Sequence, residues 1–345
     1  MRKELPKVNS DWGRFFMFQR ETLRWELLKT AIELGLFDLT TEAVTSDEVA
    51  DGLCLHRENT EHMMNALVAL GCLSKEDGKY VNNGQAESFL TSEGETSLGE
   101  SLLYMEKWML PVMNGGMKDL VKNGPKERKN IADPAIWEQG ARITVNHSRC
   151  GRAQFIADRV SELPEFQSFG SMLDLGAGPG IIAVAVTSVH DSMKSVVLDQ
   201  SPVAKVAEEI VREYGMEDRM TVRSGDYMKD DIGSGYDLIM ANFTLNFYRD
   251  DLSSVMTKVR DALNPGGVFV VMSDGISFDG TGPADSVLSW LPTTLQGEDM
   301  SIRTGQISSA MLEVGFGSTE VRVLPDEGGM QGHGPVEMTV GRKKA

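Results

Sequence analysis

From residue 171 onward, short apolar runs alternate with segments of helical periodicity, and this alternation limits the possible fold of the 345-residue chain most strongly. The apolar runs predict strands at Ser171–Leu175, Ser195–Leu198, Met220–Arg223, Tyr236–Met240 and Val268–Met272. A last helix precedes two further runs, STEVRVL and PVEMTVGRK, which predict a terminal hairpin. We therefore expect an α/β fold with a mainly parallel sheet and helices on both faces.

The first half of the chain reads as mostly helical. Thr45 and Glu48 form a predicted capping box, and residues 58–71 predict a third helix. Asp77-Gly78 then predicts a hairpin turn. Three helices followed by a hairpin is the winged-helix arrangement, which serves either DNA binding or dimerisation. The third helix is poor in cations, so we expect dimerisation. The predicted domains are 1–98 for dimerisation, 99–160 for linking helices beside a substrate pocket, and 161–345 for catalysis.

Charge and composition limit the partners. The net charge is −17, which disfavours nucleic acid and anionic membrane surfaces. The longest apolar runs, such as IIAVAV, are too short to cross a bilayer, and the first residues lack the apolar core of a signal peptide. The three cysteines have neither disulfide nor metal-ligand spacing. We expect a cytoplasmic protein that binds no metal, nucleic acid or membrane.

The sharpest motif is MLDLGAGPG, residues 172–180, where a strand runs through an acidic residue and a glycine loop into a helix. Gly176, Gly178 and Gly180 allow a tight turn and a close ligand approach at a helix N-terminus. The spacing differs from the dinucleotide fingerprint, in which a glycine stands three residues after the second one. Asp174, inside the strand end, suits a cationic ligand group better than a pyrophosphate.

Polar side chains also follow the next three strands. Asp199 ends the second strand, where a carboxylate takes ribose hydroxyls in doubly wound folds. Asp226, after the third strand, could accept from the exocyclic amine of adenine, and Asn242 follows the fourth strand. The carboxyl ends of parallel strands meet beside one crevice, so these residues predict one nucleoside-binding site.

Through these motifs, the second half resembles the class I S-adenosylmethionine-dependent methyltransferases. LDLGAGPG, VVLDQ, SGDY, YDLIMAN and LNPGG match their recurring motifs in order. The whole chain resembles the O-methyltransferase family that includes plant phenolic and acetylserotonin O-methyltransferases. The resemblance implies a Rossmann-like seven-stranded methyltransferase sheet, a winged-helix dimerisation domain, a homodimer, and S-adenosylmethionine as cofactor with S-adenosylhomocysteine as product. It also implies these cofactor-binding residues: Asp174, Gly176, Gly178, Gly180, Asp199, Gln200, Gly225, Asp226, Tyr227, Asn242 and Phe243.

One position departs from the phenolic relatives. Their catalytic base is a histidine after the fourth strand, and the alignment on YDLIMANFTLNFYRDD puts Leu245 there, followed by Asn246. Leucine accepts no proton. Phe243, Leu245 and Phe247 could form an apolar wall for an acceptor that needs no base. Alternatively, the segment is a packed connection and the base lies elsewhere.

Several residues outside this segment are candidates for the acceptor side. His147, in TVNHSRC, is the candidate base, and Arg149 with Arg152 could bind a carboxylate. His333 is a weaker candidate base. The predicted substrate-binding residues are Tyr104, Trp108, His147, Arg149, Leu245, Asn246 and Asp274.

The sequence therefore predicts a homodimeric enzyme that transfers a methyl group from S-adenosylmethionine to a small molecule. We expect an oxygen acceptor. One alternative is an S-methyltransferase that acts on a thiol or thioether acid, as in dimethylsulfoniopropionate synthesis, because sulfur can react without losing a proton. Another is a family member that binds the cofactor but runs hydroxylation or decarboxylation.

Overall fold

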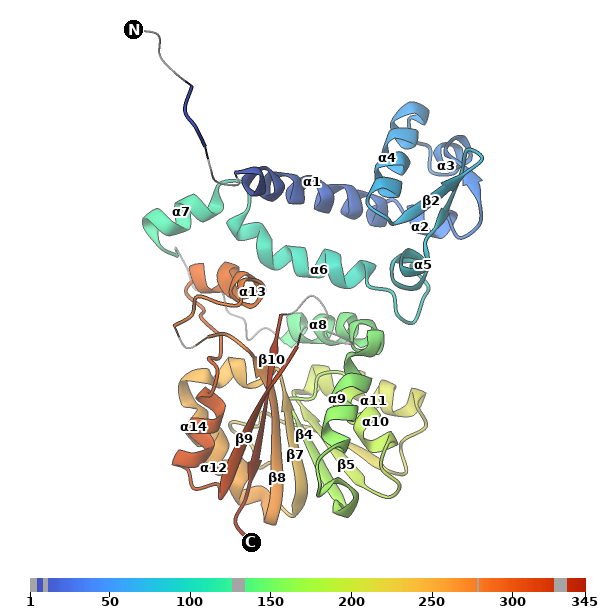
Figure 1. Ribbon diagram of the computed structural model, residues 1–345. Coiled ribbons are helices and arrows are strands. Elements are labelled where there is room, and N and C mark those ends of the chain that lie inside the picture. The colour runs from blue at the N-terminus through green and yellow to red at the C-terminus, as the bar shows by residue number, and fades with distance from the viewer. Residues whose placement is uncertain (1–4, 9–11, 126–133, 278, 326–333) are drawn as a thin grey trace. The chain divides into compact units, whose positions relative to one another are not determined.

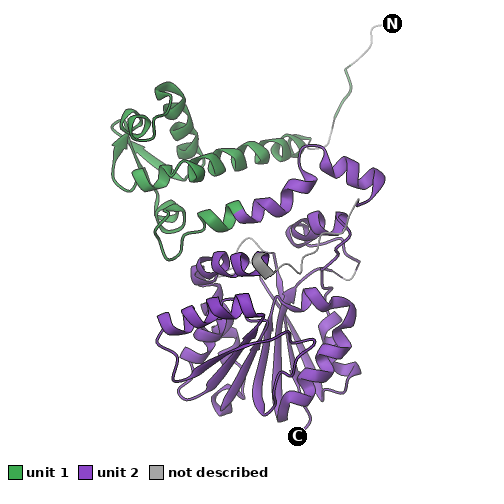
Figure 2. Cartoon of the chain, turned by 180° about the vertical axis from the view of Figure 1, so that it is seen from behind, with its two compact units in different colours: residues 1–103 green, residues 104–345 purple. Residues whose placement is uncertain are grey.

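The computed structural model describes residues 5–8, 12–125, 134–277, 279–325 and 334–345. The chain divides into two compact units, residues 1–103 and residues 104–345, which Figure 2 colours separately. The boundary predicted at residue 98 lies near this division, and most of the predicted linking segment belongs to the second unit.

The first unit contains helices and a small antiparallel sheet (Figure 1). Its elements are α1 (Gly13–Glu33), α2 (Leu36–Leu39), β1 (Val44–Thr45), α3 (Ser46–Gly52), α4 (Arg57–Ala69), β2 (Leu73–Glu76), β3 (Lys79–Asn82) and α5 (Gly84–Leu90). The predicted capping box begins α3: the Glu48 amide donates to the Thr45 side chain, and the Thr45 amide donates to the Glu48 carboxylate. The predicted hairpin joins β2 to β3, with positive φ at Asp77 and Gly78. These elements follow the order expected from the sequence.

The second unit is built on a seven-stranded sheet in the order β6-β5-β4-β7-β8-β10-β9. The strands are β4 (Ser171–Leu175), β5 (Lys194–Asp199), β6 (Met220–Ser224), β7 (Tyr236–Asn242), β8 (Leu263–Asp274), β9 (Ser318–Leu324) and β10 (Val336–Arg342). The first five of these pair in parallel, and β10 runs antiparallel between β8 and β9. The predicted sheet and terminal hairpin are thus confirmed.

Helices cover both faces of this sheet (Figure 1). The helices of one face are α9 (Ala153–Ser161), α10 (Ile181–Ser188) and α11 (Ser201–Glu213), and those of the other are α12 (Leu252–Ala262) and α14 (Gln306–Glu313). Each face has its own apolar core, because alternate residues of a buried strand point to opposite sides. Met172 and Leu173, for example, are both buried and belong to different cores.

The remaining helices of the second unit are α6 (Gly99–Met109), which begins in the first unit, α7 (Gly116–Asn123), α8 (Pro134–His147) and α13 (Ala284–Leu295). Two features differ from the sequence-based prediction. The NPGG segment, predicted as a turn, lies inside β8, where the register against β7 shifts before Val268. α13 was not predicted, and it contains Pro292. Among the described residues, no helix combines the length and apolarity needed to span a bilayer.

Candidate active site

The glycine loop and the ends of four neighbouring strands line one cavity of about 550 Å³ in the second unit. β4 leads to Gly176 and Gly178, β5 ends at Asp199, β6 leads to Asp226, and β7 ends at Asn242. β4 pairs with β5 on one side and with β7 on the other, so the strand order reverses at this point. Ligands of open α/β sheets bind at such a reversal, and the volume suits a small-molecule site.

The glycine loop needs its glycines for different reasons. Gly176, Gly178 and Gly180 all have positive φ, between 58° and 77°. A Cβ on Gly176 would lie 2.1 Å from the Thr244 hydroxyl, whereas a Cβ on Gly178 would meet no atom within 4 Å. Gly180 precedes α10 and packs near Val197, and it is not among the cavity-lining residues. Its direct cofactor contact, expected from the sequence, therefore has no support in this geometry.

Asp199 ties the glycine loop to the end of β5. Its carboxylate accepts hydrogen bonds from the Gly178 and Gln200 amides, each at 2.7 Å. Burial raises the pKa of Asp199 to about 6, despite these two bonds. The carboxylate is held in place on the cavity wall, where it can accept from ligand hydroxyls.

Asp174 and Asn242 form a polar pair behind the glycine loop. Asn242 lines the cavity, whereas Asp174 is 1% exposed and lies outside the cavity lining. The Asn242 amide donates to Asp174 Oδ1 at 3.3 Å. Asp174 Oδ2 and Asn242 Oδ1 are buried without a hydrogen-bond partner. Burial raises the pKa of Asp174 to about 7. Because an unpaired buried acceptor is costly, these two oxygens fit a ligand that brings N–H donors.

Asp226 and Tyr227 stand on the loop after β6. Asp226 accepts hydrogen bonds from the Tyr248 hydroxyl at 3.1 Å, the Met228 amide at 3.0 Å and the Lys229 ammonium at 2.8 Å. Burial raises the pKa of Asp226, but these bonds outweigh it and hold the pKa below its usual value. The Tyr227 hydroxyl donates to the Thr244 carbonyl at 3.0 Å. The loop is thereby fixed against the segment that follows β7.

The segment after β7 divides its side chains between the cavity and the core. Phe243, Thr244, Phe247 and Tyr248 line the cavity. Leu245 is 1% exposed and packs in the core shared with α12. The expectation that Leu245 forms part of the acceptor wall is therefore wrong for this geometry.

Asn246 and Asp274 also lie away from the cavity lining, contrary to the sequence-based expectation. The Asn246 amide donates to the Asp274 carboxylate and to the Met300 carbonyl, both at 2.8 Å. The Trp290 indole donates to the same carboxylate at 2.8 Å. Burial raises the pKa of Asp274. These contacts give Asn246 and Asp274 a structural role in joining α13 and the segment around Met300 to the sheet.

The two arginines near His147 have separate environments. Arg149 pairs with Glu213 at 2.5 Å and with the Tyr214 hydroxyl at 3.0 Å, so it does not bind a ligand beside Arg152 as expected. Arg152 lines the cavity, with its guanidinium 4.2 Å from the centre of the Phe243 ring. Its Nε is buried without a hydrogen-bond partner, and burial lowers its pKa to about 10. Gly151, with φ of 104°, breaks the helix between the two arginines.

No histidine is among the cavity-lining residues within the described parts of the chain. His147 ends α8 and is partly buried outside that lining. His333 lies outside the described residues. A general base at His147 is thus not supported by a contact with the cavity.

Aromatic side chains from helices also line the cavity and form what we call the aromatic wall. Tyr104 and Trp108 come from α6, as predicted, and Trp137 comes from α8. Trp137 and Phe247 meet edge to face, with ring centroids 4.6 Å apart. Trp137 and Thr144 lie on α8, and Ser148 directly follows that helix. None of the three was predicted as a site residue, although their spacing is that of one side of a helix. This wall can accommodate a flat apolar ligand.

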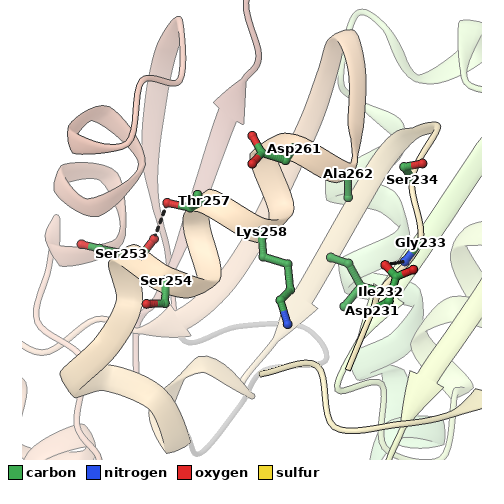
Figure 3. Close-up of a pocket in the computed structure, with 10 residues that line it drawn as sticks. All are labelled: Asp231, Ile232, Gly233, Ser234, Ser253, Ser254, Thr257, Lys258, Asp261 and Ala262. Carbon is green, nitrogen blue, oxygen red and sulfur yellow. Dashed lines mark hydrogen bonds between the residues drawn. The ribbon is translucent and has the colours of Figure 1, made fainter. Parts of the chain in front are cut away.

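A second hollow, of about 680 Å³, lies between α12 and the loop before β7 (Figure 3). It is open and is lined mainly by serine, threonine and aspartate side chains. In the described parts of the chain, no cluster of three or more histidine, cysteine or acidic side chains could hold a metal ion. The cavity at the strand ends is therefore the better candidate for chemistry.

Comparisons with known proteins agree with this geometry. A model of the O-methyltransferase domain matches residues 137–316, more than half of the chain, and a model of the O-methyltransferase dimerisation domain matches residues 22–92. The N,N-dimethyltransferase OxyT of Streptomyces rimosus is 27% identical over 297 residues, which are 84% of this chain and 86% of that protein. The 3-hydroxy-5-methyl-1-naphthoate 3-O-methyltransferase of Streptomyces sahachiroi is 23% identical over 266 residues, 76% and 77% of the two chains.

A solved structure shares the fold over the whole chain. Human N-acetylserotonin methyltransferase, in complex with S-adenosylmethionine, superposes with a TM-score of 0.77 at 21% identity, covering 99% of this chain and 100% of that one. The fold, the position of the cavity and the two family models agree. The chain belongs to the O-methyltransferase family, a family of S-adenosylmethionine-dependent methyltransferases.

Proposed function

We propose that this protein transfers the methyl group of S-adenosylmethionine to a hydroxyl oxygen of a flat aromatic small molecule, without a side-chain base. One observation carries the proposal: a single cavity joins the acceptor-rich ends of four strands to an aromatic wall that includes Trp108, Trp137 and Phe247. The strand ends suit a nucleoside with a charged tail, and the wall suits the acceptor.

The residues of the cavity fit the cofactor part by part. Asp199, fixed by two amides, would accept from the ribose hydroxyls, and Asp226 would accept from the adenine amine. The unpaired oxygens of Asp174 and Asn242 would accept from the ammonium group of the methionine end. This ammonium would supply the donors that both oxygens lack.

Arg152 completes the methionine end in this proposal. Its guanidinium lies against Phe243, the residue after Asn242, and its Nε has no partner. Among the described residues, Asp274 is the one carboxylate shown to act on Arg152 electrostatically, and it lies outside the cavity lining. A guanidinium can bind a carboxylate through two parallel hydrogen bonds, so Arg152 fits a ligand carboxylate in the cavity. Arg152 would thus hold the carboxylate of an amino acid, and the Asp174–Asn242 pair would hold its ammonium group.

Catalysis would depend on alignment. When bound, S-adenosylmethionine supplies an electrophilic methyl group that a nucleophile attacks in line with the departing sulfur. The chain's own residues would hold both reactants in this line, and the aromatic wall would exclude water. Among the described residues, the lining offers no histidine or lysine, and its two carboxylates, Asp199 and Asp226, are assigned here to the cofactor. In this proposal the acceptor would therefore react as its own anion or lose its proton to water.

The alternatives from the sequence have less support. A thioether or thiol acid carries a carboxylate that the pair Arg149 and Arg152 could bind, but Arg149 is engaged by Glu213. Hydroxylation or decarboxylation has no specific observation in its favour. The relatives include an enzyme named for an aromatic hydroxyl acceptor, the naphthoate 3-O-methyltransferase, which supports an aromatic alcohol here too.

We also propose a homodimer formed through the first unit. The start of α1 exposes large apolar side chains all around the helix: Trp12, Phe15, Phe16, Met17 and Phe18 are 40–64% exposed. The matched dimerisation domain begins at residue 22, a few residues after this stretch and within the same helix α1. Contiguous apolar surface of this kind marks a protein–protein contact. Glutamate at Phe15 and Phe18 should convert a dimer into a monomer in light scattering. A wild-type monomer, or variants that remain dimeric, would contradict the assignment.

The proposed reaction can be tested by following label. The protein is incubated with methyl-labelled S-adenosylmethionine and a panel of phenols, thiols, thioether acids and amines, and products are analysed by mass spectrometry. Label on a phenolic oxygen supports the proposal. Label on sulfur would favour the S-methyltransferase alternative, and cofactor consumption without label on any acceptor would point to a different reaction.

A further inference from the structure

The hollow in Figure 3 contains a lysine that has no assigned role. Lys258 extends from α12 into this hollow, towards the loop that follows β6 (Figure 3). Its ammonium donates to three backbone carbonyls, those of Tyr227 and Met228 at 2.8 Å and that of Asp230 at 2.9 Å. A lysine ammonium has three protons, so this arrangement uses its whole donor capacity. The hollow therefore lacks a free cation that could hold a ligand at Lys258.

The three carbonyls belong to the loop that carries two cavity residues. Asp226 and Tyr227 line the cavity, and the carbonyl of Tyr227 is one of those that Lys258 holds. Carbonyl oxygens that converge on one point repel one another unless a donor or cation lies between them. Without the ammonium, the loop would have to turn these carbonyls towards water and change its path.

A change of path would move the carboxylate of Asp226. Inside the loop, the Asp226 amide donates to Asp230 Oδ2 at 2.8 Å, and the Asp230 amide donates to the Asp226 carbonyl at 2.7 Å. Lys258 binds the carbonyl of Tyr227, directly after Asp226, and the carbonyl of Asp230. The ammonium therefore holds this turn at its start and at its end. Thr244 connects this loop to the glycine loop. Its carbonyl accepts a hydrogen bond from the Tyr227 hydroxyl, and its side chain lies close to Gly176.

We propose that Lys258 is a positioning residue for the adenine end of the cofactor. It acts from the far side of the loop and sets where the Asp226 carboxylate stands. This inference rests on the proposed function, in which Asp226 accepts from the adenine amine. It predicts that Lys258 controls affinity for the cofactor and recognition of its base, while the alignment of the methyl group and acceptor depends on other residues.

The test uses two ligands that differ only at the base. S-adenosylhomocysteine carries the adenine amine, and S-inosylhomocysteine carries a carbonyl at the same place, which would face the Asp226 carboxylate unfavourably. Calorimetry gives the dissociation constant of each ligand for the wild type, Asp226→Asn, Lys258→Met and Lys258→Arg. Lys194→Met is the matched control, because Lys194 is exposed at the start of β5, the end of the strand opposite Asp199.

We expect the wild type to prefer the adenine ligand by about tenfold or more, because the Asp226 carboxylate would face a hydrogen-bond donor in adenine and another acceptor in the inosine base. Lys258→Met should raise the dissociation constant of S-adenosylhomocysteine by about tenfold. It should also reduce the preference for adenine over inosine as far as Asp226→Asn does. Lys258→Arg should recover part of the affinity and part of the preference for adenine, since guanidinium N–H groups can also donate to the loop carbonyls. At saturating S-adenosylmethionine, kcat of Lys258→Met should stay within about threefold of wild type while the cofactor KM rises.

The outcomes separate the claims. If the wild type does not bind S-adenosylhomocysteine, the proposed function fails. If the wild type binds it but shows no preference for adenine, or Asp226→Asn keeps the preference, the adenine assignment fails and the inference with it. If Asp226→Asn loses the preference and Lys258→Met retains it, Lys258 is structural only. A lower melting temperature of Lys258→Met with an unchanged preference would lead to the same conclusion.

Discussion

Replacing Asp199 with asparagine should separate cofactor binding from stability. The carboxylate accepts from two amides and would accept from two ribose hydroxyls. A hydrogen bond to a charged group contributes about 1.5–3 kcal/mol, so losing the charge and one acceptor should weaken binding by about 3 kcal/mol or more. That corresponds to a dissociation constant about a hundredfold higher for S-adenosylhomocysteine, measured by calorimetry.

The cofactor-free protein should be little affected by the same change. Burial raises the pKa of Asp199 from 3.8 to about 6, which corresponds to at most about 3 kcal/mol of destabilisation at pH 7. We take about half of this energy as the actual destabilisation by the carboxylate, because the group is partly open to the cavity and solvent weakens the effect. Asparagine removes that cost but loses a bond from the Gly178 amide, worth about 1–2 kcal/mol. The free energy of unfolding in denaturant should therefore change by less than about 1 kcal/mol.

Asp237→Asn provides the matched control. Asp237 also accepts from two backbone amides, those of Gly170 and Ser171, but it lies at the other end of the sheet. Its replacement should reduce stability and leave the dissociation constant unchanged. An Asp199→Asn protein that binds S-adenosylhomocysteine as tightly as wild type would refute the ribose assignment. Equal losses of affinity in both variants would refute the reasoning about position.

Three further outcomes follow from the same geometry. Gly176→Ala should reduce cofactor affinity and melting temperature far more than Gly178→Ala, because only the first added methyl group meets a hydroxyl at 2.1 Å; equal effects would contradict this contact. Cofactor binding should strengthen between about pH 5 and 8, because Asp174, whose pKa is raised to about 7, must lose its proton to accept an ammonium group. A raised carboxyl pKa stabilises the folded protein below the unfolded value of 3.8, and this contribution is lost as pH rises through about 7, so the cofactor-free protein should become less stable between about pH 4 and 7. Asp174→Asn should reduce both trends in calorimetry and thermal unfolding and leave the part that Asp199 contributes, because burial raises the pKa of Asp199 to about 6. Trp137→Ala and Phe247→Ala should each raise the KM for the acceptor, because the two rings contact each other in the cavity. A double-mutant cycle on kcat/KM should give a coupling energy of about 0.5–1.5 kcal/mol between them. Strictly additive effects would show that the ring contact does not shape the acceptor wall.

The sequence predicted the fold well where the signals are local. The period of the apolar residues gives the strands, and the capping box and the Asp77-Gly78 turn are set by neighbouring residues. The strand ends that line the cavity also follow from the order of elements, because parallel strands finish on the same side of a sheet. The segment NPGG was wrongly predicted as a turn outside the strand. It lies inside β8 because of a register shift that depends on pairing with β7, which local sequence does not reveal.

The acceptor side could not be predicted in the same way. Whether Leu245 or Phe247 faces the cavity depends on the turn after β7, where Phe243 takes a positive φ of 54°. Whether Arg149 or Arg152 faces it depends on the break at Gly151 and on the partner Glu213, which is distant in sequence. Such choices are decided by tertiary contacts, so residue type and local spacing did not reveal them.

The central claim is that methyl transfer needs no side-chain base, and the dependence of kcat/KM on pH tests it most directly. The measurement uses a series of phenols that differ in pKa, at saturating S-adenosylmethionine. If alignment alone acts on the acceptor anion, the midpoint of each profile should move with the pKa of the phenol. A midpoint that stays at one value for every phenol would reveal an ionising group on the protein, and the account of a site without a base would be wrong.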